Sequence, residues 1–269
     1  MLVDSHTHID MREFDADREH VLQRAREAGV AAVIDIGIDI ASSEAAIALA
    51  EKHSDVFATV GIHPHDASKV TEADIARLEA LARHPKVIAI GETGLDFYRN
   101  RSSKESQVEA FKCQLELASK SGLPVVIHSR NAKDEVFDIL SEWVAGRKIE
   151  SRPVGVLHCF SGDADLGRKY INMGFLIAFD GPVTYPRSSA AGVAKEIPLD
   201  KMLIETDCPF LAPQAHRGKR NEPSYVSYIA ARIAELKGMS SDAVAEGTSA
   251  NAIRLFRLPI KQGVENRIL

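Results

Sequence analysis

Short, continuous apolar segments alternate with longer amphipathic ones along almost the whole chain. A continuous apolar run rich in β-branched residues is typical of a strand buried on both faces, whereas apolar residues every three or four positions are typical of a helix. The pattern predicts strands at residues 2–5, 30–37, 56–62, 87–90, 124–127, 154–157, 175–179 and 202–204. It predicts helices at residues 15–28, 42–52, 72–83, 104–121, 133–143, 164–172, 189–196, 225–237 and 241–256.

This alternation predicts an α/β protein with one parallel sheet, arranged either as a (β/α)8 TIM barrel or as an open doubly wound sheet. No low-complexity segment or Pro/Gly-rich linker divides the chain. We therefore predict a single domain over residues 1–258, followed by a polar tail over residues 259–269.

Composition excludes several classes of protein. The chain has 269 residues, of which 45% are hydrophobic and 26% charged, as in ordinary globular proteins. It contains neither an apolar run of the roughly 20 residues that span a bilayer nor a secretory signal. Its three cysteines, Cys113, Cys159 and Cys208, show no disulfide spacing and favour a reducing, cytoplasmic location. The formal net charge of −5 argues against non-specific coating of nucleic acid but is compatible with a local basic cleft.

Polar residues that can bind metal follow most of the predicted strands. They are His6 and His8 after the first strand, His63 after the third, Glu92 after the fourth, His128 after the fifth, His158 after the sixth and Asp207 after the eighth. An open sheet gathers ligands at one switch point, whereas a closed ring brings all strand ends to a common centre. The distribution therefore favours the barrel, with metal ligands at the carboxyl ends of its strands.

Four of these histidines (His6, His8, His128 and His158) and the two carboxylates are more ligands than one ion needs, so the sequence predicts two divalent metals. Two ions roughly 3.5–4 Å apart can activate water for a displacement at phosphorus or carbon. Such a pair needs a bridging anion, for which Glu92 is the candidate. His6, His8 and Asp207 would complete one metal site, and His128 with His158 the other. Asp207 is also the candidate general base. Histidine-rich ligation favours Zn, Mn, Ni or Co over tight Mg binding.

Six ordered segments resemble one known family. They are Ser5-His-Thr-His8, Gly61-Ile-His-Pro-His65, Gly91-Glu-Thr-Gly-Leu-Asp96, His128-Ser-Arg130, His158-Cys-Phe-Ser-Gly162 and Glu205-Thr-Asp-Cys-Pro209. Together they are similar to the TatD family of metal-dependent deoxyribonucleases. The resemblance implies an amidohydrolase-like barrel that hydrolyses phosphodiesters of DNA, often as a 3′ exonuclease. It also implies that the two metals lie on His6, His8, Glu92, His128, His158 and Asp207.

Residues around these ligands suggest how a nucleic acid would bind. His63 and Arg130 are predicted to contact the scissile phosphate, because Arg130 lies two residues beyond His128 and a guanidinium can hold phosphate oxygens in pairs. Six further cations follow strands four, seven and eight and are expected on the same rim: Arg99, Arg101, Arg187, Arg217, Lys219 and Arg220.

Other polar residues receive supporting roles. Glu205 is predicted to orient a ligand. His65 has a less certain role, and Asp4 and Asp96 are expected to be structural rather than catalytic. Cys159 and Cys208 are interpreted as small buried residues rather than ligands.

Two alternatives stay open. The same bimetal platform could hydrolyse an ester, such as that of a D-aminoacyl-tRNA, or the chain could be a non-catalytic metal-binding protein. The sequence does not specify the native metal or the oligomeric state, for which a monomer is the simplest hypothesis.

Overall fold

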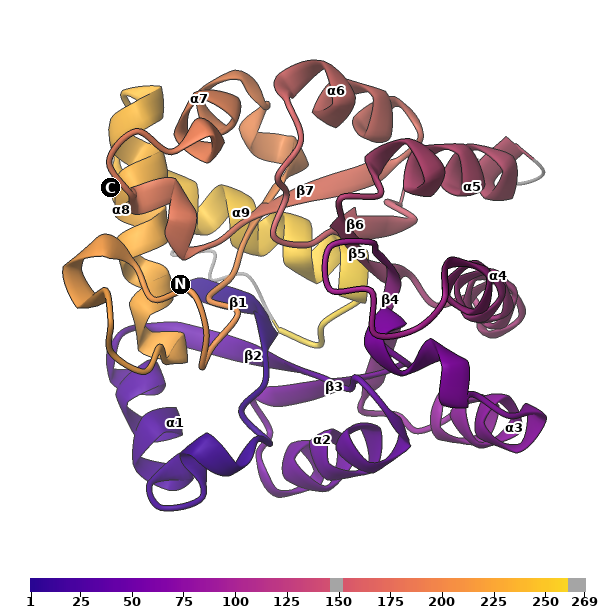
Figure 1. The fold of residues 1–269 in the computed structure, drawn as a ribbon. Helices are drawn as coiled ribbons and strands as arrows, with labels where there is room; N and C mark the ends of the chain where they lie inside the picture. Colours follow the sequence, from indigo (N-terminus) through magenta and orange to yellow (C-terminus); the bar gives the residue numbers. More distant parts are fainter. Residues whose placement is uncertain (146–151, 261–269) are drawn as a thin grey trace.

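Eight parallel strands form one sheet in sequence order in the computed structural model, which describes residues 1–145 and 152–260. The strands are β1 (Leu2–Thr7), β2 (Val30–Ile36), β3 (Val56–Val60), β4 (Val87–Asp96), β5 (Val125–Arg130), β6 (Gly155–Leu157), β7 (Phe175–Phe179) and β8 (Met202–Ile204). A parallel bridge between Thr7 and Cys208 joins the first strand to the segment that follows the last. The fold is therefore a (β/α)8 TIM barrel (Figure 1). The alternative prediction of an open doubly wound sheet is wrong.

Helices surround the barrel (Figure 1), and each predicted helix is found. They are α1 (Arg18–Glu27), α2 (Ile40–Lys52), α3 (Glu72–Leu81), α4 (Lys104–Ser121), α5 (Lys133–Ala145), α6 (Ala164–Asn172), α7 (Ser189–Glu196), α8 (Val226–Lys237) and α9 (Ser241–Phe256). Capping residues begin several of them: the Asp39 carboxylate accepts the Ser42 N–H before α2, and the Thr71 hydroxyl accepts the Asp74 N–H before α3. Most of the predicted tail, residues 261–269, lies outside the described part of the chain.

Three strands run further than the apolar pattern predicts. β1 continues to Thr7, β4 to Asp96 and β5 to Arg130, because their polar residues keep pairing along the sheet. Gly94 pairs with His128, and Asp96 pairs with Arg130. Side chains alternate along a strand, so this extension brings Glu92, Gly94 and Asp96 to one face of β4.

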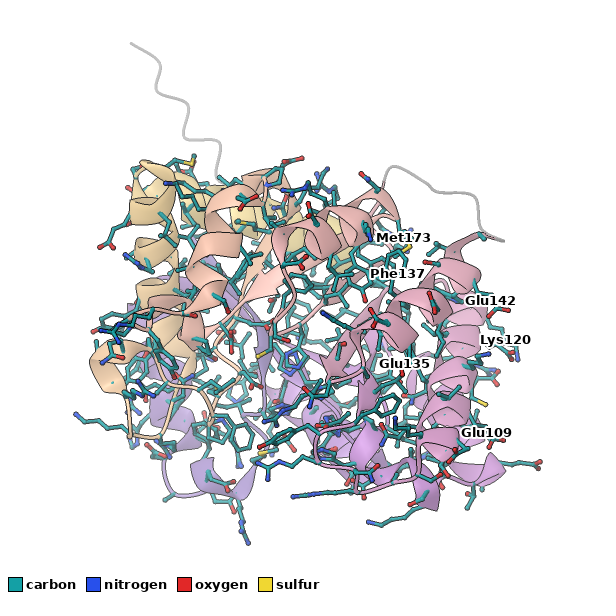
Figure 2. The ribbon with its side chains drawn as sticks, turned by 45° about the horizontal axis from the view of Figure 1, so that its top comes forward. Glu109, Lys120, Glu135, Phe137, Glu142 and Met173 are labelled. Atoms are coloured by element: carbon teal, nitrogen blue, oxygen red, sulfur yellow. The ribbon has the colours of Figure 1, made fainter. Side chains whose placement is uncertain are left out.

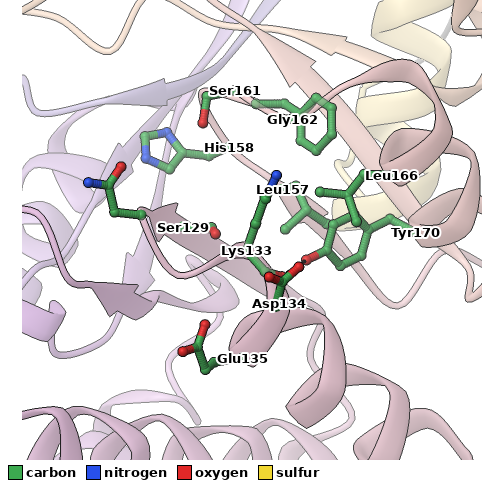
Figure 3. A pocket seen from close by; sticks show the side chains of 12 residues that line it. Ser129, Lys133, Asp134, Glu135, Leu157, His158, Ser161, Gly162, Leu166 and Tyr170 are labelled. Carbon is green, nitrogen blue, oxygen red and sulfur yellow. Dashed lines mark hydrogen bonds between the residues drawn. The ribbon is translucent and has the colours of Figure 1, made fainter.

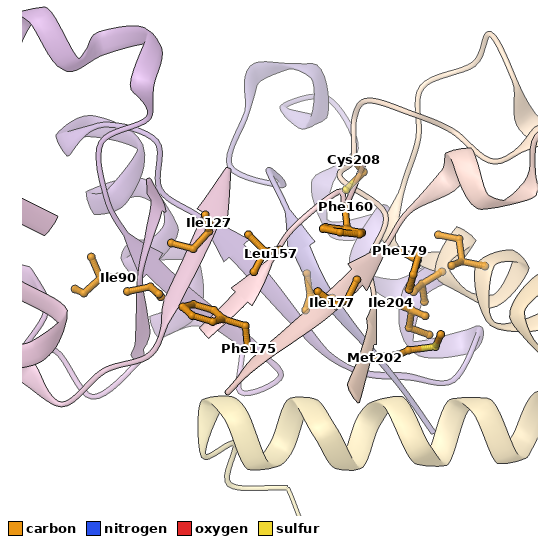
Figure 4. Packing of buried hydrophobic residues seen from close by; sticks show 14 of the residues in the cluster. Ile90, Ile127, Leu157, Phe160, Phe175, Ile177, Phe179, Met202, Ile204 and Cys208 are labelled. Carbon is orange, nitrogen blue, oxygen red and sulfur yellow. The ribbon is translucent and has the colours of Figure 1, made fainter. Parts of the chain in front are cut away.

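Two apolar clusters build the core. One lies between the barrel and its helices and contains Ile90, Ile127 and Ile177 (Figure 4). The other fills the barrel and contains Val3, Ala32, Ile34, Leu176 and Leu203 together with residues of α9. On the outside, Figure 2 shows Glu109, Lys120 and Glu142 directed into solvent from α4 and α5.

Within residues 1–145 and 152–260, the helices are too short or too polar to cross a bilayer.

Candidate metal centre

The carboxyl end of the barrel gathers all six predicted metal ligands. Five of them, His6, His8, Glu92, His158 and Asp207, are buried, and His128 is partly buried. Loop contacts hold the set together: the Asp207 N–H donates to the His6 carbonyl at 2.9 Å, and the His8 N–H donates to the Cys208 carbonyl at 2.8 Å. The segment after β8 is thereby fastened to β1, and its carboxylate is fixed beside the two histidines.

The two carboxylate oxygens of Glu92 face two different groups of histidines. Oε2 lies 3.4 Å from His6 Nε2 and 3.9 Å from His8 Nε2. Oε1 lies 2.7 Å from His128 Nδ1 and 3.0 Å from His158 Nε2. Asp207 Oδ1 completes the first group at 3.5 Å from His8 Nε2 and 3.7 Å from His6 Nε2. Glu92 therefore stands between two sets of donors, as a bridging carboxylate must.

The hydrogen bonds of the ring nitrogens indicate which nitrogen is free to bind an ion. His8 Nδ1 lies 3.1 Å from the Ile36 carbonyl oxygen. A carbonyl only accepts, so Nδ1 carries a proton, and Nε2, which points at Glu92 and Asp207, is the nitrogen available to an ion. His158 Nδ1 lies 3.3 Å from Glu205 Oε1, within ion-pair distance but without hydrogen-bond geometry, and its Nε2 lies toward Glu92. A carboxylate behind a histidine in this way is the usual support of a metal ligand.

His63 has the opposite tautomer. Its Nδ1 accepts the backbone N–H of His65 at 3.1 Å, so its Nε2 carries the proton and lies 3.5 Å from Glu92 Oε1. Burial lowers the pKa of His63 to about 3, so the ring is neutral at neutral pH. Although His63, Glu92 and His128 lie close enough to share an ion, a protonated Nε2 is a hydrogen-bond donor and not a ligand.

Asp96 lies in contact with this centre, and the expectation that it is structural rather than catalytic stays a prediction. Asp96 Oδ2 lies 3.3 Å from His128 Nε2 and 3.0 Å from His65 Nε2. His128 is thus held between Asp96 and Glu92. The alternation of Glu92, Gly94 and Asp96 is the sequence signal that would have found it, once β4 was extended past Ile90.

The cluster fits a divalent metal. His6 is fully buried, and neither of its ring nitrogens has a hydrogen-bond partner. A buried polar atom without a hydrogen-bond partner destabilises a folded protein unless another group binds it. Two donors that share a tetrahedral ion at about 2.0–2.1 Å lie roughly 3.3–3.4 Å apart, close to the separations between His6, Glu92, His8 and Asp207. His6, His8 and Asp207 form one group able to hold an ion, and His6, Glu92 and His158 form another.

The carboxylates of the cluster are ionised. Burial acts to raise the pKa of Glu92, but the charge of His158 and the hydrogen bonds from His128 and His158 outweigh it and hold that pKa well below its usual value. Burial likewise opposes ionisation of Asp207, whose pKa is nevertheless lowered, chiefly by its hydrogen bond with His8. Two negative charges therefore face the histidines, as a cation site requires.

Glu205 lies behind His158. One carboxylate oxygen accepts the Cys159 N–H at 2.6 Å and the other accepts the Ser5 hydroxyl at 3.3 Å. Cys159 is partly buried, and its thiol donates to Asp180 at 3.1 Å; Cys208 is fully buried. Among the described residues, neither thiol belongs to a group that could hold an ion.

A cavity of about 650 Å³ opens over the cluster. Its rim includes Arg99, Arg101 and Arg130, and the Arg130 guanidinium lies 4.1 Å from the centre of the exposed Tyr98 ring. Of the seven cations expected on this rim, Arg187, Arg217, Lys219 and Arg220 do not line the cavity, and the Arg220 guanidinium instead binds Asp17 at 2.8 Å.

Comparisons of sequence and of structure identify the same family. The model of the family described as TatD related DNase matches residues 3–257. An uncharacterized metal-dependent hydrolase, YabD of Bacillus subtilis, is 43% identical over 96% of this chain and 100% of its own. A 3′-5′ ssDNA/RNA exonuclease TatD of Enterobacter lignolyticus is 37% identical over 91% of this chain and 94% of its own. The crystal structure of YJJV, a TatD homologue from Escherichia coli K12, superposes with a TM-score of 0.89 at 32% identity, covering 96% of this chain and 98% of that one.

Proposed function

Because the chain belongs to the TatD-related DNase family and is a metal-dependent hydrolase, we propose that it cleaves phosphodiester bonds of DNA as a 3′–5′ exonuclease acting on single strands or free ends. The observation that carries the proposal is the position of Glu92 between two groups of histidines. Relatives named as 3′-5′ exonucleases support the polarity and the single-stranded substrate.

We assign two ions to the cluster. His6, His8 and Asp207 would hold one, His128 and His158 the other, and Glu92 would bridge them with one oxygen each. Bound there, two divalent ions would lower the pKa of water and stabilise the charge that develops on a phosphate in the transition state. Zn, Mn, Ni and Co suit this histidine-rich set, and Mg suits it less.

The protein's own groups have separate tasks. Asp207 is ionised and faces the cavity with 12% of its side chain exposed, so it can accept the proton of the attacking water. His63 presents its Nε2–H toward the cluster and can donate to a phosphate oxygen. Glu205 places a negative charge beside His158 Nδ1, and Asp96 fixes the orientation of His128 through Nε2.

The exposed rim selects for nucleic acid. Arg130 offers a guanidinium to the phosphate backbone, and Tyr98, on which it lies, offers an aromatic face to a base. Single-stranded DNA presents both unpaired bases and phosphates, so this pair suits it better than a duplex.

The test is hydrolysis of a 5′-labelled single-stranded oligonucleotide by the metal-free protein before and after each of Zn, Mn, Ni, Co and Mg is added. We expect no cleavage without metal and stepwise shortening from the 3′ end with it. The competing hypothesis of ester hydrolysis is examined in parallel with a D-aminoacyl-tRNA. Deacylation together with intact oligonucleotide under every metal would contradict the nuclease assignment.

A further inference from the structure

A second cavity, of about 420 Å³, adjoins the metal cluster between the loops that follow β5 and β6 (Figure 3). Ser129, His158 and Ser161 line both this cavity and the one over the metals, so the two communicate at His158. Its volume falls within the roughly 300–1,000 Å³ typical of small-molecule sites. A ligand bound here would therefore touch a proposed metal ligand directly.

The floor of this side cavity is apolar and aromatic. Leu157, Phe160 and Tyr170 are each at least nine-tenths buried, yet all three line the cavity together with Leu166. Phe160 and Tyr170 meet at right angles, with ring centroids 6.3 Å apart, which is a favourable arrangement for two aromatic rings. Apolar side chains around an open space favour a flat, weakly hydrated group over a charged one.

Charged side chains of both signs lie around the floor, in different places. In Figure 3 the Lys133 side chain extends between His158 on one side and Leu166 and Tyr170 on the other. Lys133 forms no salt bridge with any residue in the described parts of the chain, so its ammonium is free to donate to a ligand. Asp134 and Glu135, at the start of α5, line the cavity as well and disfavour a phosphate there.

We propose that this side cavity binds the 3′-terminal nucleoside of the substrate, with its base on the Phe160–Tyr170 floor and its base acceptors near Lys133. The 5′ phosphate of that nucleoside then lies at His158 and the metals. The cavity suits a chain end, because Asp134 and Glu135 would repel the phosphate of any nucleotide beyond it. This inference rests on the proposed nuclease activity.

The experiment compares two single-stranded oligonucleotides that differ only in whether the 3′-terminal residue carries a base or is abasic. For the wild-type protein with metal, we expect kcat/KM to be roughly five- to hundredfold higher with the base, the range that stacking of one base on protein side chains gives. Leu166→Trp, which fills the cavity, should reduce this ratio to about one while cleavage of the abasic substrate is unchanged. Lys133→Met should lower the ratio part of the way, and Lys112→Met, on the outer face of α4, should leave it unchanged.

The abasic substrate serves as the internal control for folding and for metal binding. Equal cleavage of the two substrates by the wild-type protein would overturn the assignment of the cavity and leave the nuclease activity standing. Failure to cleave either substrate would instead overturn the proposed function. If Leu166→Trp keeps the full base preference but slows hydrolysis of a D-aminoacyl-tRNA, the cavity holds an acyl group and the proposal is wrong.

Discussion

The two ends of the barrel differ in chemistry: one is lined by polar side chains, and the other is closed by apolar ones. At the carboxyl ends of the strands, histidines and carboxylates are buried together, and His6 keeps two ring nitrogens without partners. At the amino ends, α9 lies across the strands (Figure 4) and closes the barrel with Ala252, Leu255 and Phe256. The polar groups there are satisfied: Asn251 donates to the carbonyls of Leu199 and Met202, both at 2.8 Å.

This difference separates activity from stability. Buried polar groups without partners destabilise a fold, so the metal end depends on the rest of the barrel to hold its geometry. The closed end contributes apolar burial and paired hydrogen bonds, which stabilise the fold without touching a substrate. Substitutions at the two ends should therefore affect different measurements.

The largest effect is expected at the bridging position. Glu92→Gln replaces the carboxylate that faces both histidine groups with a neutral amide, so kcat should fall by several orders of magnitude and metal content should drop. Elemental analysis and single-turnover cleavage measure the two effects. A variant that retains its metals and wild-type turnover would contradict the bridging assignment.

Phe256→Ala examines the closed end. The side chain is 2% exposed, and its loss leaves a cavity between α9 and the strands, so the free energy of unfolding should fall by about 3–5 kcal/mol. Chemical denaturation measures this change. Below the unfolding transition, kcat should stay close to the wild-type value. A large loss of kcat in the folded variant would show that the two ends are coupled.

Glu205→Gln should have an intermediate effect on the metal end. The amide keeps the shape of the side chain but removes the negative charge beside His158 Nδ1, and losses of roughly 10–100-fold in metal affinity or activity are typical of such supporting residues. Metal titration measures the affinity, and the cleavage rate measures the activity. Unchanged values in both would indicate that Glu205 only anchors the Cys159 N–H and the Ser5 hydroxyl.

His63→Ala tests the tautomer argument. If His63 donates one hydrogen bond to the phosphate, kcat/KM should fall. The loss of transition-state stabilisation calculated from it should be about 1–3 kcal/mol, while the metal content of the protein stays the same. His63→Gln, which retains a donor, should recover part of the loss. A loss equal to that of Glu92→Gln, accompanied by loss of metal, would make His63 a ligand.

The smallest effect concerns an ion-pair network outside the barrel. Hydrogen bonds from Arg220 lower the pKa of Asp17 to about 2, and the pKa of Glu222 is lowered by Arg24 and Ser224 against the opposing effect of burial. A carboxyl whose folded pKa is depressed stabilises the protein above its unfolded pKa of about 4 and loses that contribution as pH falls toward 2. The difference in melting temperature between wild type and Asp17→Asn should therefore be small, present at pH 6 and absent near pH 2. A difference that persists at pH 2 would mean that Asp17 acts through packing.

Much of this architecture is evident in the sequence because it depends on local pattern. Eight apolar runs separated by amphipathic segments predict the strands and helices, and polar residues at the run ends predict which side chains gather at one face. The roles of the six predicted ligands stay predictions, but their placement in one cluster follows from closing the ring. The sequence alone does not predict the contact of Asp96 with His128, because a buried polar stretch does not look like a strand until its partner strand is known.

Only the tertiary structure decides what each histidine can do. His8 and His63 are the same residue type just beyond the ends of β1 and β3, yet the Ile36 carbonyl fixes the proton of one ring on Nδ1, and the His65 N–H fixes that of the other on Nε2. The side cavity lined by Phe160 and Tyr170 likewise arises from packing between the loops that follow β5 and β6. Local periodicity is encoded by neighbouring residues, whereas proton position and cavity shape depend on groups that meet only after the barrel has closed.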